Sequence, residues 1–202
     1  MSKCSGLVGL PDSIAHLIAL QTLNLYMCHG LAALPDNIAH LTALQTLNLS
    51  KCIGLVGLPD SMEHLLALRT LDLSECCGLV ELPDSIRHLT ALQTLYLADM
   101  RGLVGLPDSV GHLTALHTLN LSNCSGLVGL PNSIGRLHTL ELLYLSRGTS
   151  LAELPNSIGQ LTALQIDHLP SSDIDVGFLP GSNGVLNALG VLSLSSGDMH
   201  FE

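Results

Sequence analysis

Leucines recur along the chain in the pattern L-x-x-L-x-L, first complete at Leu20, Leu23 and Leu25. The second half of this pattern alternates apolar and polar residues, so Leu23 and Leu25 point to one side while Asn24 points to the other. Such alternation predicts a short, half-buried β-strand. Because the pattern returns throughout the sequence, it predicts a series of equivalent strands.

The pattern repeats every 24 residues, as the prolines show most clearly. They stand at Pro11, Pro35, Pro59, Pro83, Pro107, Pro131 and Pro155. The same step relates Leu25, Leu49, Leu73, Leu97, Leu121, Leu145 and Leu169. Seven units of the form L-x-x-L-x-L-x-x-C-x-G-L-x-x-L-P-D-S-I-x-x-L-x-A follow, and a degenerate eighth copy, at about residues 171–196, is expected to cap the C-terminal end. We therefore expect a single domain over residues 1–202.

Each unit also predicts how the chain leaves and re-enters the strand. A glycine column is expected to give the freedom for a tight turn after the strand: Gly6, Gly30, Gly54, Gly78, Gly102 and Gly126. The Pro-Asp-Ser-Ile segment then starts a short helical turn, which Asp12, Asp36, Asp60, Asp84 and Asp108 are placed to N-cap. Ile14 and Leu17 point back inward. The stacked units predict an α/β solenoid with a concave parallel β-sheet and short helical turns on the convex side.

The seventh unit departs from this pattern. Asp167 occupies a position at which the other units place leucine, and His168 falls in an outward position of the strand. The irregularity is consistent with an approaching end of the regular repeats.

Composition and charge limit the kinds of partner. The chain is 47% hydrophobic and 12% charged, with seven Lys and Arg against 17 Asp and Glu, for a net charge of −10. Nucleic acid and anionic membranes select for basic patches, so neither is expected as a partner. The sequence has no uncharged apolar run of 18 residues and shows no signal peptide, which together predict a cytoplasmic protein.

We interpret the cysteine and histidine columns first as structural residues, and only second as sites for metal binding or pH sensing. Cys4, Cys28, Cys52, Cys76 and Cys124 share one repeat position, and a ladder of buried thiols fits a reducing compartment. A histidine column follows the same step: His16, His40, His64, His88 and His112. Stacked imidazoles can bind zinc or sense pH, but copying of one ancestral unit explains the column equally directly. No metal or cofactor is expected. The Asn-x-Ser sequons on the strands are interpreted as accidental.

The units resemble the leucine-rich-repeat family over roughly residues 1–196. Their L-P-x-S-I-G-x-L-x-x-L-x-x-L-x-L-S-x-C form is similar to cytosolic plant-type repeats, which occur in intracellular nucleotide-binding immune receptors and in Ras-group relatives. The extracellular plant receptor-kinase type differs, since it has Asn in the cysteine position and G-x-I-P where this chain has Gly9, Leu10 and Pro11. The resemblance implies a recognition module, a role in innate immunity and plant defence, and a side chain in the cysteine position that caps backbone groups of the turn.

Outward positions of the strands are the expected partner site. Counting from the first leucine of each unit, these are the third, fifth, seventh and eighth residues, and all three tyrosines of the chain fall among them. Tyrosine is a favoured interface anchor. The candidate site consists of Tyr26, Arg69, Asp72, Glu75, Tyr96, Asp99, Asn120, Tyr144 and Arg147. Neutral drift on a solvated sheet is the competing interpretation.

Three functions are compared on this basis. The first is a protein-binding module, either the sensor part of a larger immune receptor or a scaffold. The second is binding of a carbohydrate or another surface or small ligand through the Thr, Asn and Ser rows. The third is an enzyme, which is not expected because no nucleophile–His–acid grouping, P-loop or metal motif occurs. The chain begins within a unit, which suggests either a fragment of a larger protein or self-association through an uncapped N-terminal end.

Overall fold

The computed structural model describes residues 3–145 and 154–167. In these residues five-residue 3-10 helices alternate with three-residue strands along the chain. The helices are η1 (Asp12–His16), η2 (Asp36–His40), η3 (Asp60–His64), η4 (Asp84–His88), η5 (Asp108–His112), η6 (Asn132–Arg136) and η7 (Asn156–Gln160). The strands are β1 (Thr22–Asn24), β2 (Thr46–Asn48), β3 (Thr70–Asp72), β4 (Thr94–Tyr96), β5 (Thr118–Asn120), β6 (Leu142–Tyr144) and β7 (Gln165–Asp167).

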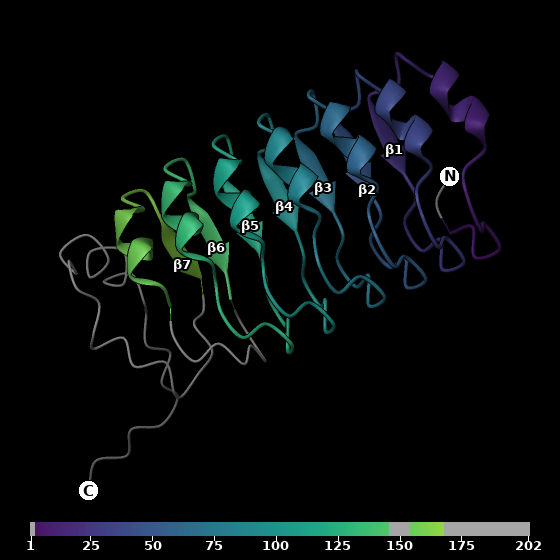
Figure 1. Cartoon of the computed structure of the whole chain (residues 1–202). Helices are drawn as coiled ribbons and strands as arrows, with labels where there is room; N and C mark the ends of the chain where they lie inside the picture. The colour runs from purple at the N-terminus through teal and green to yellow at the C-terminus, as the bar shows by residue number, and fades with distance from the viewer. Residues whose placement is uncertain (1–2, 146–153, 168–202) are drawn as a thin grey trace, which may run out of the picture.

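All seven strands form one parallel sheet in the order β1 to β7, and the helices stack on the opposite side of the solenoid (Figure 1). Neighbouring strands from β1 to β6 pair residues 24 apart, for example Leu47 with Leu71. The predicted fold is therefore confirmed: an α/β solenoid with a concave sheet and short helical turns on the convex side. The degenerate eighth repeat at about 171–196 lies outside the described residues.

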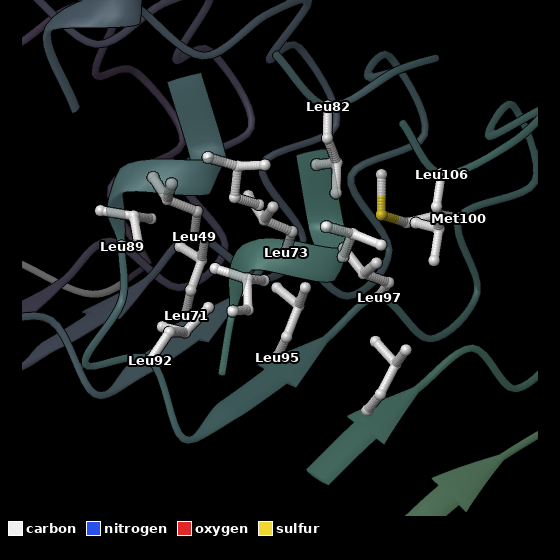
Figure 2. Packing of buried hydrophobic residues seen from close by; sticks show 14 of the residues in the cluster. Leu49, Leu71, Leu73, Leu82, Leu89, Leu92, Leu95, Leu97, Met100 and Leu106 are labelled. Atoms are coloured by element: carbon white, nitrogen blue, oxygen red, sulfur yellow. The ribbon is translucent and has the colours of Figure 1, made fainter. Parts of the chain in front are cut away.

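The interior is a ladder of leucines between the sheet and the helices. Leu71 and Leu73 of one repeat and Leu95 and Leu97 of the next are fully buried and lie side by side (Figure 2). Leu89 reaches the same interior from the helical side. A single repeat has too little apolar surface to enclose itself, so stacking of identical repeats supplies the core.

The helices begin after proline and not after an aspartate cap. Pro11 holds extended backbone at φ −71° and ψ 150°, and Asp12 is the first helical residue. The expectation that Asp12, Asp36, Asp60, Asp84 and Asp108 serve as N-caps is therefore wrong, because proline occupies the capping position in every repeat. The fixed φ of proline sets the direction in which each helix starts.

The glycine column has a different role from the one expected. The left-handed backbone after each strand is adopted by non-glycine residues, with φ near 60° at Lys3, Met27, Lys51, Glu75, Asp99 and Asn123. The glycines instead allow close approach of backbones. A Cβ on Gly54 would lie 2.7 Å from the His29 carbonyl oxygen, and one on Gly126 would lie 2.6 Å from that of Arg101. Gly6 is the exception, since a Cβ there would meet nothing within 4 Å.

The last described strand changes register by one residue. β7 pairs Ile166 with Leu143 and Asp167 with Tyr144, a step of 23 residues in place of 24. The interpretation that Asp167 takes a leucine position is therefore wrong, because Ile166 is the residue in register with Leu143. His168, expected in the outward position, lies outside the described residues.

Candidate protein-binding face

The outward positions of the strands bring most of the candidate residues onto one face. Arg69 precedes β3, Asp72 ends β3, and Tyr96, Asn120 and Tyr144 end β4, β5 and β6. The other candidates follow the strands, in the turn: Tyr26, Glu75 and Asp99. Arg147 lies outside the described residues. Arg69 is exposed, while the tyrosines are partly buried.

In most repeats the side chain of the fifth residue accepts a hydrogen bond from the backbone. Asn24 Oδ1 accepts a hydrogen bond from the Tyr26 N–H at 2.9 Å, and Asp72 Oδ1 accepts one from the Ser74 N–H at 3.0 Å. Asn48 and Asn120 make the same contact two residues along. These are Asx turns, in which a side chain replaces a backbone partner. Two candidate residues, Asp72 and Asn120, therefore stabilise the turn as well as facing outward. Sequence analysis missed this role, although the Asn and Asp column is its signal.

Tyr96 and Tyr144 occupy the same fifth position but cannot make an Asx turn. A phenol side chain is too long and too rigid to return to the backbone two residues ahead, so each tyrosine gives up a stabilising contact that the other repeats make. In exchange it presents a large aromatic surface with a hydroxyl at its tip. These two positions therefore differ from the rest of the column in the direction expected for recognition.

A second row of side chains runs along the left-handed residues after the strands. Lys51 Nζ lies 3.2 Å from Glu75 Oε1 and 5.9 Å from the ring centre of Tyr26. The hydrogen bond and the charge of Glu75 raise the pKa of the Lys51 ammonium. Further along, the Asn123 side-chain amide donates to Asp99 Oδ1. The candidates Tyr26, Glu75 and Asp99 are therefore linked to neighbouring repeats and held in place.

The cysteine column joins repeats in the interior. Cys52, Cys76 and Cys124 each donate from Sγ to a carbonyl oxygen of the preceding repeat, those of Leu25, Leu49 and Leu97, at 3.0–3.2 Å. Burial raises the thiol pKa to about 11 for Cys52, about 12 for Cys76 and about 11 for Cys124. Such thiols are poor nucleophiles. Cys4 and Cys77, by contrast, are exposed.

The histidine column lies on the convex helices. His64 and His88 both approach Glu63, at 3.8 and 3.6 Å, and Arg87 Nε donates to His88 Nε2 at 3.1 Å. Among the described residues, no group of three or more His, Cys, Asp or Glu side chains is close enough to hold a metal ion.

The N-terminal end of the solenoid exposes interior residues. Leu17 is 49% exposed, whereas Leu41 and Leu65 at the equivalent positions are fully buried. The neighbouring Ile18 is 64% exposed. Self-association through this end stays a prediction.

Comparisons with known proteins agree with the fold. Residues 59–147 match the family model described as leucine-rich repeat region. The chain is similar to the leucine-rich repeat domain of the type III effector XopL, with 26% identity and a TM-score of 0.54, over 82% of this chain and 73% of that one. It is also similar to the Arabidopsis receptor kinase HAESA, solved in complex with the peptide hormone IDA and the co-receptor SERK1. There the identity is 27% and the TM-score 0.51, over 78% of this chain but only 31% of that one.

No curated protein matches the sequence. In the described part of the chain no helix is long and apolar enough to cross a membrane. Leucine-rich-repeat domains generally mediate protein–protein interaction and are typically not enzymes. The chain thus has the leucine-rich-repeat fold, and residues 59–147 match the model of a leucine-rich repeat region.

Proposed function

We propose that this chain is a recognition module whose concave face binds a protein partner around Tyr96 and Tyr144. The observation that carries the proposal is the loss of the Asx turn at these two positions, where Asn24, Asn48, Asp72 and Asn120 keep it. Departures from a local structural rule are expected at functional positions. An aromatic side chain that replaces a stabilising polar one on an outward face fits an interface anchor.

The flanking residues supply directional contacts. Glu75 and Asp99 lie in the turns that follow β3 and β4, and Lys51 and Asn123 hold them from neighbouring repeats. Arg69 adds a positive charge at the opposite end of the strands. The proposed partner therefore buries the two tyrosines and places polar groups against a rim of mixed charge. Arg147 belongs to this proposal on sequence grounds alone.

The finer role we propose is the sensor part of a cytoplasmic plant-type immune receptor or scaffold. Two observations support it: the likeness of the repeat sequence to cytosolic plant-type repeats and the ladder of buried thiols. Neither catalysis nor a cofactor is part of the proposal.

The test is affinity capture from the native cell with four immobilised chains: wild type, Tyr96→Ala, Tyr144→Ala and the double variant. Quantitative mass spectrometry should identify a protein that wild type retains and that the double variant loses by about tenfold or more. The variants should fold normally, since both tyrosines lie on the outward side of the sheet.

Val56→Ser is the matched control. Val56 is 69% exposed on the loop that leaves the strand, away from the outward positions of the sheet. Its variant should retain the same protein as wild type. If the double tyrosine variant retains every protein that wild type retains, the partner does not use this face and the proposal fails.

A further inference from the structure

The convex side carries a polar groove that the proposed protein-binding face does not involve. It crosses η4, η5 and η6, which lie side by side before β4, β5 and β6 (Figure 1), and it has a volume of about 440 Å³. Its lining residues are all polar: Asp84, Arg87, Asp108, Ser109, His112, Asn132, Ser133 and Arg136. The volume is in the range of small-molecule sites.

The helices give the groove two different sides. Asp84, Asp108 and Asn132 are the first residues of the three helices, and Arg87, His112 and Arg136 are at their ends. Because a 3-10 helix rises about 2 Å per residue, the two rows are separated by roughly 6–8 Å along the helix axes. One side of the groove therefore offers carboxylate and amide oxygens, while the other offers guanidinium and imidazole groups.

The opposite charges do not neutralise each other. Within residues 3–145 and 154–167, neither Arg87 nor Arg136 forms an ion pair with Asp84 or Asp108. The fourth helical position, which carries Arg87 in η4, is Gly111 in η5, where the next helix packs closely: a Cβ on Gly111 would lie 2.6 Å from the Cβ of Ser133. The charged side chains of the lining are exposed. The charged groups on both sides thus stay accessible to a ligand.

Two serines of the lining have fully buried hydroxyls without a hydrogen-bond partner. Ser109 and Ser133 are each 8% exposed, and their Oγ atoms have no partner among the described residues. A buried hydroxyl without a partner is destabilising unless something satisfies it. Ser85 and Ser157 share this repeat position and this condition, but they do not line the groove.

We propose that the groove binds a small hydroxylated anion of the sugar-phosphate class. The anionic group would lie against Arg136, His112 and Arg87, because guanidinium groups bind phosphate with paired hydrogen bonds. The sugar hydroxyls would donate to Asp84, Asp108 and Asn132 on the other side. The site is independent of the concave face.

Isothermal titration calorimetry of the full chain, at low ionic strength, tests this with three probes: glucose 6-phosphate, inorganic phosphate and glucose. Glucose 6-phosphate should bind at least about tenfold more tightly than either of the other two. No heat of binding up to about 10 mM would overturn the proposal. Equal affinity for inorganic phosphate would overturn it too, since the contacts to the sugar hydroxyls would then contribute nothing. Equal affinity for glucose would likewise overturn it, since the contacts to the anionic group would then contribute nothing.

Two pairs of variants locate the site. Arg136→Gln should weaken glucose 6-phosphate binding about tenfold, while Arg101→Gln, an exposed arginine outside the groove, should change it less than about twofold. Asp108→Asn should weaken it, and Asp60→Asn, at the same helix position but outside the groove, should not. Equal effects within either pair would show diffuse charge attraction or a general change in stability, and would overturn the assignment.

Discussion

Leu71 and Asp72 are consecutive residues of β3, yet they are under different constraints. Leu71 is fully buried and stands in register with Leu47 and Leu95, so every repeat requires an apolar side chain of similar volume there. Asp72 is in register with Asn48 on one side and Tyr96 on the other. The inward side tolerates almost no variation, whereas the outward side combines turn-forming residues with residues free to vary. We therefore expect the proposed recognition to use outward positions that the turns do not require.

The largest expected effect is on the inward side. Leu71→Ala should lower the free energy of unfolding by about 2–5 kcal/mol, because the stacked repeats on both sides cannot close around the cavity. Urea unfolding followed by circular dichroism measures the change. Leu66→Ala is the control, since Leu66 is 62% exposed and its truncation should cost less than about 0.5 kcal/mol. Similar losses for both variants would contradict the inward assignment.

The glycines allow a finer test of packing between repeats. Gly54→Ala should destabilise the chain by about 1–3 kcal/mol, because its Cβ would lie 2.7 Å from the backbone oxygen of His29 and neither backbone can move freely. Gly57→Ala is matched to it, three residues along the same loop, with nothing within 4 Å of its Cβ. That change should be neutral or slightly stabilising, by up to about 1 kcal/mol. Thermal melts of the two variants should therefore move apart.

Three of the buried thiols, those of Cys52, Cys76 and Cys124, give the inward side a pH dependence. Their pKa values of about 11 to 12 lie above the ordinary value of 9.0, so the unfolded chain loses these protons first as the pH rises. The contribution of these thiols to the free energy of unfolding is complete below pH 9. It is lost as the pH rises from there through the pKa values of the folded state. Each buried thiol should cost about 1 kcal/mol of unfolding free energy between pH 8 and pH 10. Urea unfolding at the two pH values measures the total.

Two cysteine variants separate this effect from other titrations. Cys76→Ala should reduce the loss between pH 8 and pH 10, whereas Cys77→Ala, which removes the exposed neighbouring thiol, should reduce it much less. Identical pH profiles for both variants would show that the buried thiols do not account for the dependence.

The repeat period explains which features could be predicted from sequence. A 24-residue step with leucine at fixed positions predicts the parallel sheet, its register through β6 and the buried leucines. The prediction is secure because the same pattern recurs in each repeat. Details that depend on contacts between repeats were missed. Gly54 was interpreted by its conformational freedom, when it is required by the nearby His29 carbonyl, and the left-handed residue is Lys51, three positions earlier.

Only part of the candidate site can be predicted from the sequence. Outward positions follow from alternation, so Tyr96 and Tyr144 could be placed on the sheet face. The Asx turn of Asp72 depends on how its side chain bends back, which no alternation pattern reports. The shift at β7 was missed because the proline and leucine spacing stays at 24 up to Leu164, and the single-residue deletion comes directly after it.

The smallest expected effect is on the outward side, at the left-handed residue Met27, whose φ is 60°. A side chain with a Cβ is strained in this conformation by roughly 1–2 kcal/mol, but asparagine tolerates it, as Asn123 does in the fifth strand's turn with the same φ. Met27→Asn should therefore be more stable than Met27→Ala by about 0.5–1 kcal/mol, in urea unfolding of the two variants. Both variants lose the contacts that the methionine side chain makes, so this loss cancels when the two are compared. If alanine were as stable as asparagine here, the turn would carry no strain, and its residues would be as free to vary as Tyr96 and Tyr144.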